Sequence, residues 1–177
     1  MEPRPRFVVD AMLGSLARKL RILGFDTLYF QSGTDEELES LARGDGRIVL
    51  TRDRAVLERS RTGRFEAVGV EGRTDAERLR SLASKTRLAV GPRGEWQSRC
   101  AVCNGALRVV ARGELGLGEV PERVLKRHRL FYRCESCSRT FWRGGHWARI
   151  GRIARPLRPK GQAPGGGRAR RPRRRSP

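Results

Sequence analysis

The 177-residue sequence lacks any apolar run long enough to span a membrane. Its first residues, MEPRPRFVVDAM, also lack the uninterrupted apolar stretch of a secretion signal, because Asp10 follows only three apolar residues. We therefore predict a soluble, cytoplasmic protein without a membrane partner.

Acidic residues are few, at 19 against 39 Lys and Arg, and the formal net charge is +20. Residues 1–98 hold 18 basic and 15 acidic residues, whereas residues 99–150 hold 11 and 4. Residues 151–177 hold ten basic residues and no acid. A basic excess that grows along the chain predicts a polyanionic partner, although charge alone does not separate RNA from DNA.

A dinucleotide-binding motif of the GxGxxG type is missing after the first apolar segment, so a nucleotide-cofactor enzyme is not indicated. Short apolar segments instead alternate with helical patterns and predict strands at residues 7–10, 27–30, 47–53 and 67–70. Alternating strands and helices indicate an α/β fold, in which a parallel sheet lies between two helical layers.

Three helix ends can be read from local signals. Gly24 is expected to end the helix that follows the first strand, because glycine readily adopts the left-handed conformation of a C-terminal cap. Thr34 with Glu37, and Thr74 with Glu77, have the spacing of capping boxes at the starts of two further helices.

The chain divides into four segments by composition. We predict an α/β domain at residues 1–90, a linker at 91–98, a small module at 99–150 and a tail at 151–177. The tail is mainly Arg, Pro and Gly, with only two large aliphatic residues. Such a segment cannot build an apolar core, so we predict that it is disordered.

Three acids stand where predicted strands meet helices. Asp10 ends the first strand, Asp35 opens the helix after the second, and Asp53 follows the third. In a parallel sheet these positions share one edge, where converging carboxylates favour a cation such as Mg²⁺ or Mn²⁺. The alternative is that each Asp only stabilises the start of a helix, which is a common role.

Cysteine occurs only four times, as two CxxC pairs: Cys100 with Cys103, and Cys134 with Cys137. Two such pairs on facing turns form a closed tetrahedral shell, which indicates a structural zinc ion in a small ribbon. Zinc would also supply folding energy to a segment of about fifty residues that has little core of its own. Disulfides or a redox dithiol are the alternatives.

Aromatic and basic residues are interleaved around the second cysteine pair. Trp142, Arg143 and His146 are candidates for RNA contact, because aromatic faces stack on unpaired bases while Arg neutralises phosphates. Arg52, beside the third strand, is a further candidate for a phosphate contact. The alternatives are that the rings fill the thin core of the module and that the polar side chains are solvated or serve local structure.

Several motifs occur together in one order: VVDAMLGSLARKLRILGFDT, GTDEELESLA, GRIVLTRD, a CxxC pair, FYRCESC and FWRGGHW. On these motifs the chain resembles the PIN-like ribonucleases of the Mut-seven C-terminal RNase domain family, which carry a zinc ribbon. The resemblance covers residues 6–150 and leaves out the tail.

The resemblance implies a PIN-like domain and an Mg²⁺- or Mn²⁺-dependent endonuclease acting on RNA. It also implies that Asp10, Asp35 and Asp53 are the catalytic metal ligands. Other PIN domains usually have a fourth acid, for which Asp75, Glu36 and Glu71 are all available.

Two functions from different classes follow. The first is a metal-dependent ribonuclease in which the zinc ribbon and the basic tail hold RNA. The second is a non-catalytic RNA-binding or ribosome-associated protein, in which the acids are helix caps and the zinc and Arg-rich parts carry the function.

Overall fold

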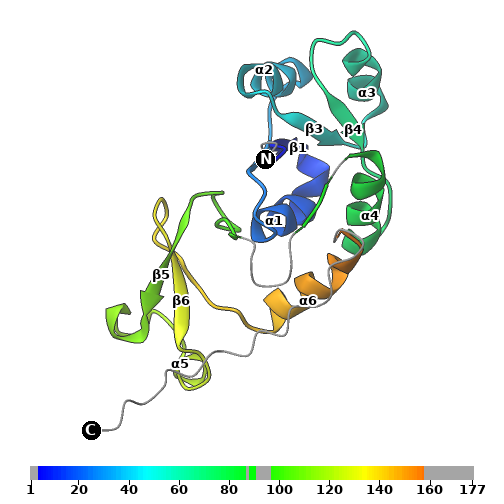
Figure 1. Cartoon of the computed structure of the whole chain (residues 1–177). Coiled ribbons are helices and arrows are strands. Elements are labelled where there is room, and N and C mark those ends of the chain that lie inside the picture. The colour runs from blue at the N-terminus through cyan, green and yellow to red at the C-terminus, as the bar shows by residue number, and fades with distance from the viewer. Residues whose placement is uncertain (1–3, 87, 91–96, 158–177) are drawn as a thin grey trace, which may run out of the picture.

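The computed structural model describes residues 4–86, 88–90 and 97–157. It contains a four-stranded parallel sheet and a three-stranded antiparallel sheet (Figure 1). The parallel sheet has the order β2-β1-β3-β4 and consists of β1 (Phe7–Val9), β2 (Thr27–Tyr29), β3 (Ile48–Thr51) and β4 (Ala67–Gly69). Each predicted strand is present, and every pairing in this sheet is parallel as predicted.

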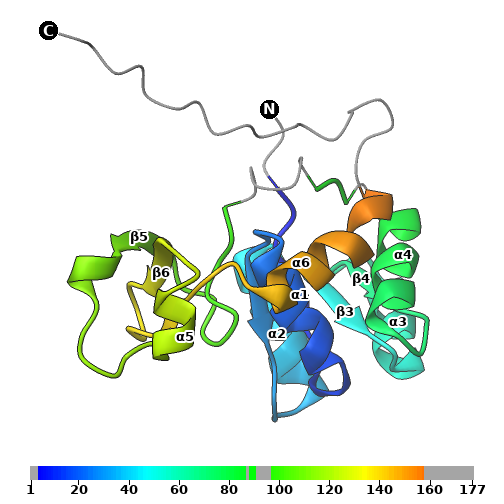
Figure 2. The ribbon, with the colours of Figure 1, turned by 90° about the horizontal axis from the view of Figure 1, so that it is seen from below.

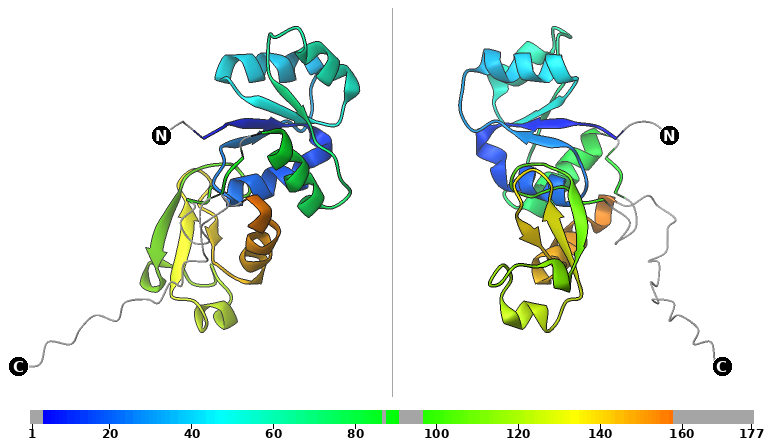
Figure 3. Two further views of the ribbon diagram at one scale, coloured as in Figure 1. Left: turned by 45° about the vertical axis from the view of Figure 1, so that its right-hand side comes forward. Right: turned by 90° about the vertical axis from the view of Figure 1, so that its left-hand side faces the viewer.

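Helices cover both faces of the parallel sheet, as the left view of Figure 3 shows. Successive side chains of β1 and β3 point to opposite faces, so Val9 and Leu50 lie in one apolar core while Val8 and Val49 lie in the other. One face packs against α1 (Gly14–Ile22) and α4 (Asp75–Lys85), and the other against α2 (Asp35–Asp45) and α3 (Arg54–Ser60). The predicted three-layer α/β architecture is therefore confirmed.

The local signals at helix ends are also confirmed. Thr34 and Glu37 form a reciprocal capping box at the start of α2, and Thr74 and Glu77 form another at the start of α4. Gly24 follows α1 with φ of +89°, and a Cβ atom there would lie 2.7 Å from the carbonyl oxygen of Gln97. This position therefore requires glycine for its conformation and for the close approach of a second segment.

The antiparallel sheet belongs to a small unit, residues 99–144, which we call the cysteine module. Its strands are β5 (Leu107–Ala111), β6 (Leu130–Cys134) and β7 (Thr140–Phe141), with the short helices η2 (Arg112–Glu114) and α5 (Glu122–Leu125) between β5 and β6. Val110, Val120 and Phe131 make up its buried core. Three side chains are a small core, which agrees with the expected need for a metal.

The C-terminal part of the described chain differs from the prediction. α6 (Gly145–Ile153) and η3 (Arg155–Leu157) cross the expected boundary at residue 151 and return to the α/β domain. Figure 2 shows α6 lying beside α1 and α4. Ile150, Ala154 and Leu157 are buried in the same core as Val9 and Leu50, so the expectation of disorder was wrong for residues 151–157.

The physical reason is a helical stripe among the arginines. Trp147, Ile150, Ala154 and Leu157 recur every three or four residues, which places them on one side of a helical segment. The remainder of the predicted tail, residues 158–177, lies outside the described residues, as do residues 91–96 of the predicted linker. Within the described part of the chain, each helix falls short of the length and apolarity that crossing a membrane would require.

Candidate active site and metal centre

The C-terminal edge of the parallel sheet brings Asp10 and Asp53 to one side chain, Thr51. Thr51 is the buried last residue of β3, and its hydroxyl donates a hydrogen bond to Asp10 Oδ2 at 2.7 Å. The same hydroxyl oxygen accepts the backbone N–H of Asp53 at 3.0 Å. We call these three residues the carboxylate edge. The Thr51 hydroxyl fixes the Asp10 carboxylate and ties it to the start of the next loop.

The two aspartates differ in how they relate to the helices that follow them. Asp53 caps α3, because its Oδ1 accepts the N–H of Ala55 at 2.7 Å and that of Val56 at 3.4 Å. The Asp10 side chain makes no capping bond to η1 (Ala11–Leu13). The helix-cap alternative therefore describes Asp53 but leaves the Asp10 carboxylate without a capping role.

Asp35 is held by an arginine that the sequence analysis did not single out. Arg59 of α3 contacts Asp35 Oδ2 at 2.7 Å and Glu39 Oε1 at 2.5 Å. The hydrogen bonds that Arg59 donates to Glu39 and Asp35 raise the pKa of Arg59 above its already high usual value. The negative charge of Asp35 is thus compensated within the protein.

Two of the three candidates for a fourth acid are also paired with basic side chains. Asp75, at the start of α4, accepts a hydrogen bond from Ser15 at 2.7 Å and pairs with Lys19 at 2.5 Å. Burial opposes ionisation of Asp75, but the hydrogen bonds from Lys19 and Ser15 lower its pKa overall. Glu71 pairs with Lys85 at 2.5 Å, and Glu36 is an exposed residue in the first turn of α2.

Asp10 and Asp53 differ from Asp35, Asp75 and Glu71, which are paired with basic side chains. Within residues 4–86, 88–90 and 97–157, no Lys, Arg or His nitrogen lies within 4.0 Å of either carboxylate. Two uncompensated carboxylates at one edge of a sheet are a donor set that suits a hard divalent cation. The acids do not form a closed shell: among the described residues, the cysteines alone bring three or more ligand atoms within 4.8 Å of one another.

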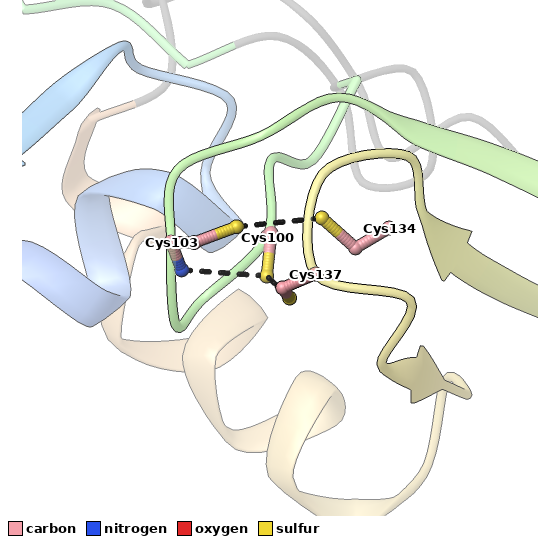
Figure 4. A group of neighbouring side chains, drawn as sticks. All are labelled: Cys100, Cys103, Cys134 and Cys137. Atoms are coloured by element: carbon pink, nitrogen blue, oxygen red, sulfur yellow. Dashed lines mark hydrogen bonds between the residues drawn. The ribbon is translucent and has the colours of Figure 1, made fainter.

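The cysteine cluster is drawn together by two facing turns (Figure 4). Cys100 Sγ lies 3.6 Å from Cys137 Sγ, and Cys103 Sγ lies 3.4 Å from Cys134 Sγ. A tetrahedron of zinc–sulfur bonds of about 2.3 Å has edges of about 3.8 Å, so the cluster fits zinc with small outward shifts. The spacings far exceed a disulfide bond of about 2.05 Å, and all four cysteines are free thiols.

The two cysteine turns have nearly the same backbone. Asn104 N–H donates to the Cys100 carbonyl at 2.9 Å, and Ser138 N–H donates to the Cys134 carbonyl at 3.0 Å. Asn104 has φ of 69° and Ser138 has φ of 57°, so each turn ends in the left-handed region. This repeated geometry is compatible with a zinc ribbon, in which each turn presents two thiolates to one ion.

The model of the Mut7-C RNAse domain family matches residues 5–154, which include the parallel sheet, the cysteine cluster and α6. The chain belongs to the Mut7-C RNAse domain family. The match confirms the resemblance inferred from the sequence motifs, and membership supports a ribonuclease-type function with RNA as the class of substrate. No curated protein and no solved structure matches the chain.

In this Mut7-C chain the thiols have unequal acidities. Burial is the largest influence on Cys100 and raises its pKa to about 12. Burial also acts on Cys134, but the backbone N–H groups of Cys137 and Ser136 outweigh it and lower the Cys134 pKa to about 7. N–H groups directed at a sulfur stabilise the thiolate, which is the form that ligates a metal.

Arg21 anchors the cysteine module to the α/β domain. Its side chain is 6% exposed and donates to the carbonyls of Thr27 at 2.8 Å, Ala101 at 3.2 Å and Val102 at 2.8 Å. The first and third carbonyls belong to different units, so one buried guanidinium joins β2 to the first cysteine turn. The module is thereby fixed at the N-terminal edge of the parallel sheet.

The four predicted nucleic-acid contacts fall into two places. Arg52 is exposed beside the carboxylate edge. Trp142, Arg143 and His146 line a cavity between the cysteine module and the α/β domain, near the N-terminal edge of the sheet. The structure therefore separates a candidate phosphate contact near the carboxylates from the aromatic and basic group near the cysteines.

Proposed function

We propose that this Mut7-C protein is a metal-dependent endoribonuclease whose cation is held by Asp10 and Asp53, with Asp35 as a further ligand. The observation that supports it most directly is the Thr51 hydroxyl, which contacts both Asp10 Oδ2 and Asp53 N. A buried hydroxyl that fixes the uncompensated Asp10 carboxylate beside the backbone of Asp53, a second uncompensated acid, supports a site for positive charge. Helix capping alone does not require that arrangement.

The protein groups have distinct roles in this proposal. A bound Mg²⁺ or Mn²⁺ would supply Lewis-acid stabilisation of the phosphodiester and lower the pKa of water. Thr51 holds the Asp10 carboxylate in one orientation, and the α3 N–H groups hold Asp53 by its Oδ1. Arg52, exposed beside them, is placed to meet a phosphate of the RNA strand.

Asp35 enters this site only by exchanging partners. Its carboxylate is paired with Arg59, so cation binding has to compete with that ion pair. The Asp35 and Arg59 side chains are 47% and 41% exposed, and exposed pairs of this kind contribute only about 0.2–1 kcal/mol. A divalent cation, with twice the charge of the guanidinium, is able to displace it.

The cysteine module has a structural part in the same proposal. Four thiolates saturate the shell of a zinc ion, which leaves no position for substrate or water. The module and the basic segment 151–177 would hold RNA, with Trp142, Arg143 and His146 as contacts. A reducing, cytoplasmic location, in which thiols remain available to metal, belongs to this proposal.

The test compares Asp53→Asn and Asp10→Asn with Glu58→Gln, which removes one negative charge from an exposed ion pair on α3. Asn caps a helix about as well as Asp, so Asp53→Asn should keep the wild-type stability. Mn²⁺-dependent cutting of a mixed RNA pool should fall by orders of magnitude in both Asp variants and stay at the wild-type level in Glu58→Gln.

The second candidate function is a non-catalytic RNA-binding protein, favoured by the pairing of Asp35 with Arg59. It predicts that Asp53→Asn changes neither RNA processing nor cation binding. An Asp53→Asn protein that cuts at the wild-type rate, with contaminating nuclease removed, would favour this function over the ribonuclease.

A further inference from the structure

A cavity of about 1020 Å³ lies where the cysteine module meets the α/β domain. We call it the interdomain groove. Both units and the start of α6 contribute to it: its walls include Ile22, Gly24, Tyr132, Trp142, Arg143 and His146. The volume is sufficient for a ligand of more than one ring system.

The lining of the interdomain groove has one chemical character. It contains four aromatic side chains and three arginines, and none of the described residues that line it is acidic. Aromatic faces offer stacking surfaces for planar groups, while arginines attract phosphates. A ligand that matches both kinds of side chain is a nucleic-acid strand, which carries planar bases and negatively charged phosphates.

Arg143 is held in place by two of the aromatic rings. Its guanidinium carbon lies 5.2 Å from the centroid of the Tyr132 ring and 4.8 Å from that of the Trp147 ring. Tyr132 belongs to β6 and Trp147 to α6, so the contacts fix Arg143 between the two units. A guanidinium held by stacking loses less conformational freedom when its N–H groups bind a phosphate.

We propose that the interdomain groove binds an unpaired stretch of RNA, with bases against its aromatic side chains and phosphates at Arg143 and His146. An unpaired stretch is required because the faces and edges of bases in a duplex are already stacked and paired. The choice of RNA as the ligand rests on the function proposed above. The assignment of the groove as a binding site rests on its shape, charge and aromatic content.

The interdomain groove lies apart from the carboxylate edge. Ile22 is the last residue of α1, whereas Gly14, its first residue, follows the segment that begins at Asp10. Nine helical residues span about 13 Å, so the groove and the carboxylate edge lie at opposite ends of α1. RNA held in the groove would therefore need a connecting segment to reach the carboxylates.

The experiment measures RNA binding in buffer without Mg²⁺ or Mn²⁺, so that cutting does not contribute. Arg143→Glu is compared with Arg149→Glu, which makes the same charge change on α6 at an exposed residue outside the groove lining. A short unstructured oligoribonucleotide should bind Arg143→Glu about tenfold more weakly than wild type, and Arg149→Glu much less so. A blunt RNA duplex should bind both variants almost equally.

His146→Glu serves as a second groove variant if Arg143→Glu does not fold, as judged by zinc content and circular dichroism. Equal losses of oligoribonucleotide affinity in groove and control variants would overturn the proposal. So would competition by polyglutamate as strong as that by the oligoribonucleotide, because the groove would then select charge alone. These affinities do not depend on cleavage, so the proposal for the groove and the proposal for the carboxylate edge are tested independently.

Discussion

The side-chain amide of Asn104 donates a hydrogen bond to Asp26 Oδ1 at 2.8 Å, and this bond joins the first cysteine turn to the start of β2. Asn104 Oδ1 also accepts the backbone N–H of Thr27 at 3.0 Å. The left-handed backbone of Asn104 thus completes the cysteine turn while its side chain pairs with the α/β domain. Folding around the cysteines and docking of the module are linked through one residue.

Asp26→Asn should reveal the electrostatic part of this link. Burial opposes ionisation of Asp26, but hydrogen bonds from Arg47 and Asn104 lower its pKa overall. A lowered pKa in the folded protein adds stability above the unfolded value of about 3.9, and this stability is lost as the pH falls through the folded pKa. At pH 7 we expect Asp26→Asn to lower the free energy of unfolding by about 2 kcal/mol.

The difference between wild type and Asp26→Asn should then shrink as the pH falls below about 3.9. Urea unfolding at several pH values measures it, with Glu58→Gln as the exposed control. Both proteins keep the same thiols, so a zinc ion held by them would be released by acid to the same extent in both. A difference that does not change with pH would show that the Asp26 charge contributes nothing to the stability of the folded protein.

The part of the fold that sequence predicted well depends on local signals. The capping box of Thr34 with Glu37 involves residues three apart, and the two CxxC pairs set their own turns. The pairing of Asp35 with Arg59 joins residues that lie 24 positions apart in the sequence and on different helices, so no local sequence pattern predicts it. The interdomain groove, similarly, exists only because the cysteine module docks at the edge of the sheet opposite the carboxylates.

Gly105→Ala should weaken zinc binding. A Cβ atom on Gly105 would lie 2.5 Å from Ser136 Oγ and 3.0 Å from Cys134 Sγ, and would push the two cysteine turns apart. Displacing groups that support metal ligands typically costs about 10–100-fold in affinity. Gly113→Ala is the control, because nothing lies within 4 Å of its added Cβ.

The measurement is zinc content after competition with a chelator, with Cys134→Ser as the reference for a lost ligand. Wild type should hold one zinc ion per chain if all four cysteines ligate a single ion. Equal zinc affinity in Gly105→Ala and Gly113→Ala would mean that the two turns do not need this close approach.

Arg59→Gln should increase the affinity for Mn²⁺. The substitution releases Asp35 and Glu39 from their ion pairs, so Asp35 no longer has to exchange a guanidinium for the cation. The gain should be about two- to fivefold, because exposed ion pairs are weak. Titration calorimetry or Mn²⁺ paramagnetic resonance measures it directly, without an activity assay.

Arg61→Gln is the matched control, since it breaks an ion pair with Glu58 at 3.0 Å at the C-terminal end of the same helix. If both variants bind Mn²⁺ as tightly as wild type, Asp35 is not a ligand and its pairing with Arg59 is purely structural.

Two truncations should separate stability from RNA binding. Ending the chain after Arg149 removes Ile150, Ala154 and Leu157, which are at most 4% exposed, and should cost about 4 kcal/mol of unfolding free energy. Ending it after Leu157 should keep the stability but remove eight positive charges. Its RNA affinity should then fall and depend less steeply on salt.

Thermal unfolding and RNA titration over a range of salt concentrations distinguish the two chains. Wild-type stability in the shorter chain would contradict the role assigned to α6. An unchanged salt dependence in the longer one would show that residues 158–177 do not contact RNA.

The packing of α6 into the core that contains Val9 and Leu50 also has a consequence for folding during protein synthesis. A ribosome releases residues 1–90 before the cysteine module and α6 exist, so the apolar surface that later receives Ile150 and Leu157 is uncovered at first. At about 5–20 residues per second, the remaining residues to 157 take roughly 3–13 seconds. During that interval the nascent chain exposes apolar surface of the kind that chaperones bind. Protein synthesis that stops within the cysteine module would leave this surface permanently exposed, and such fragments should aggregate or be degraded rather than accumulate.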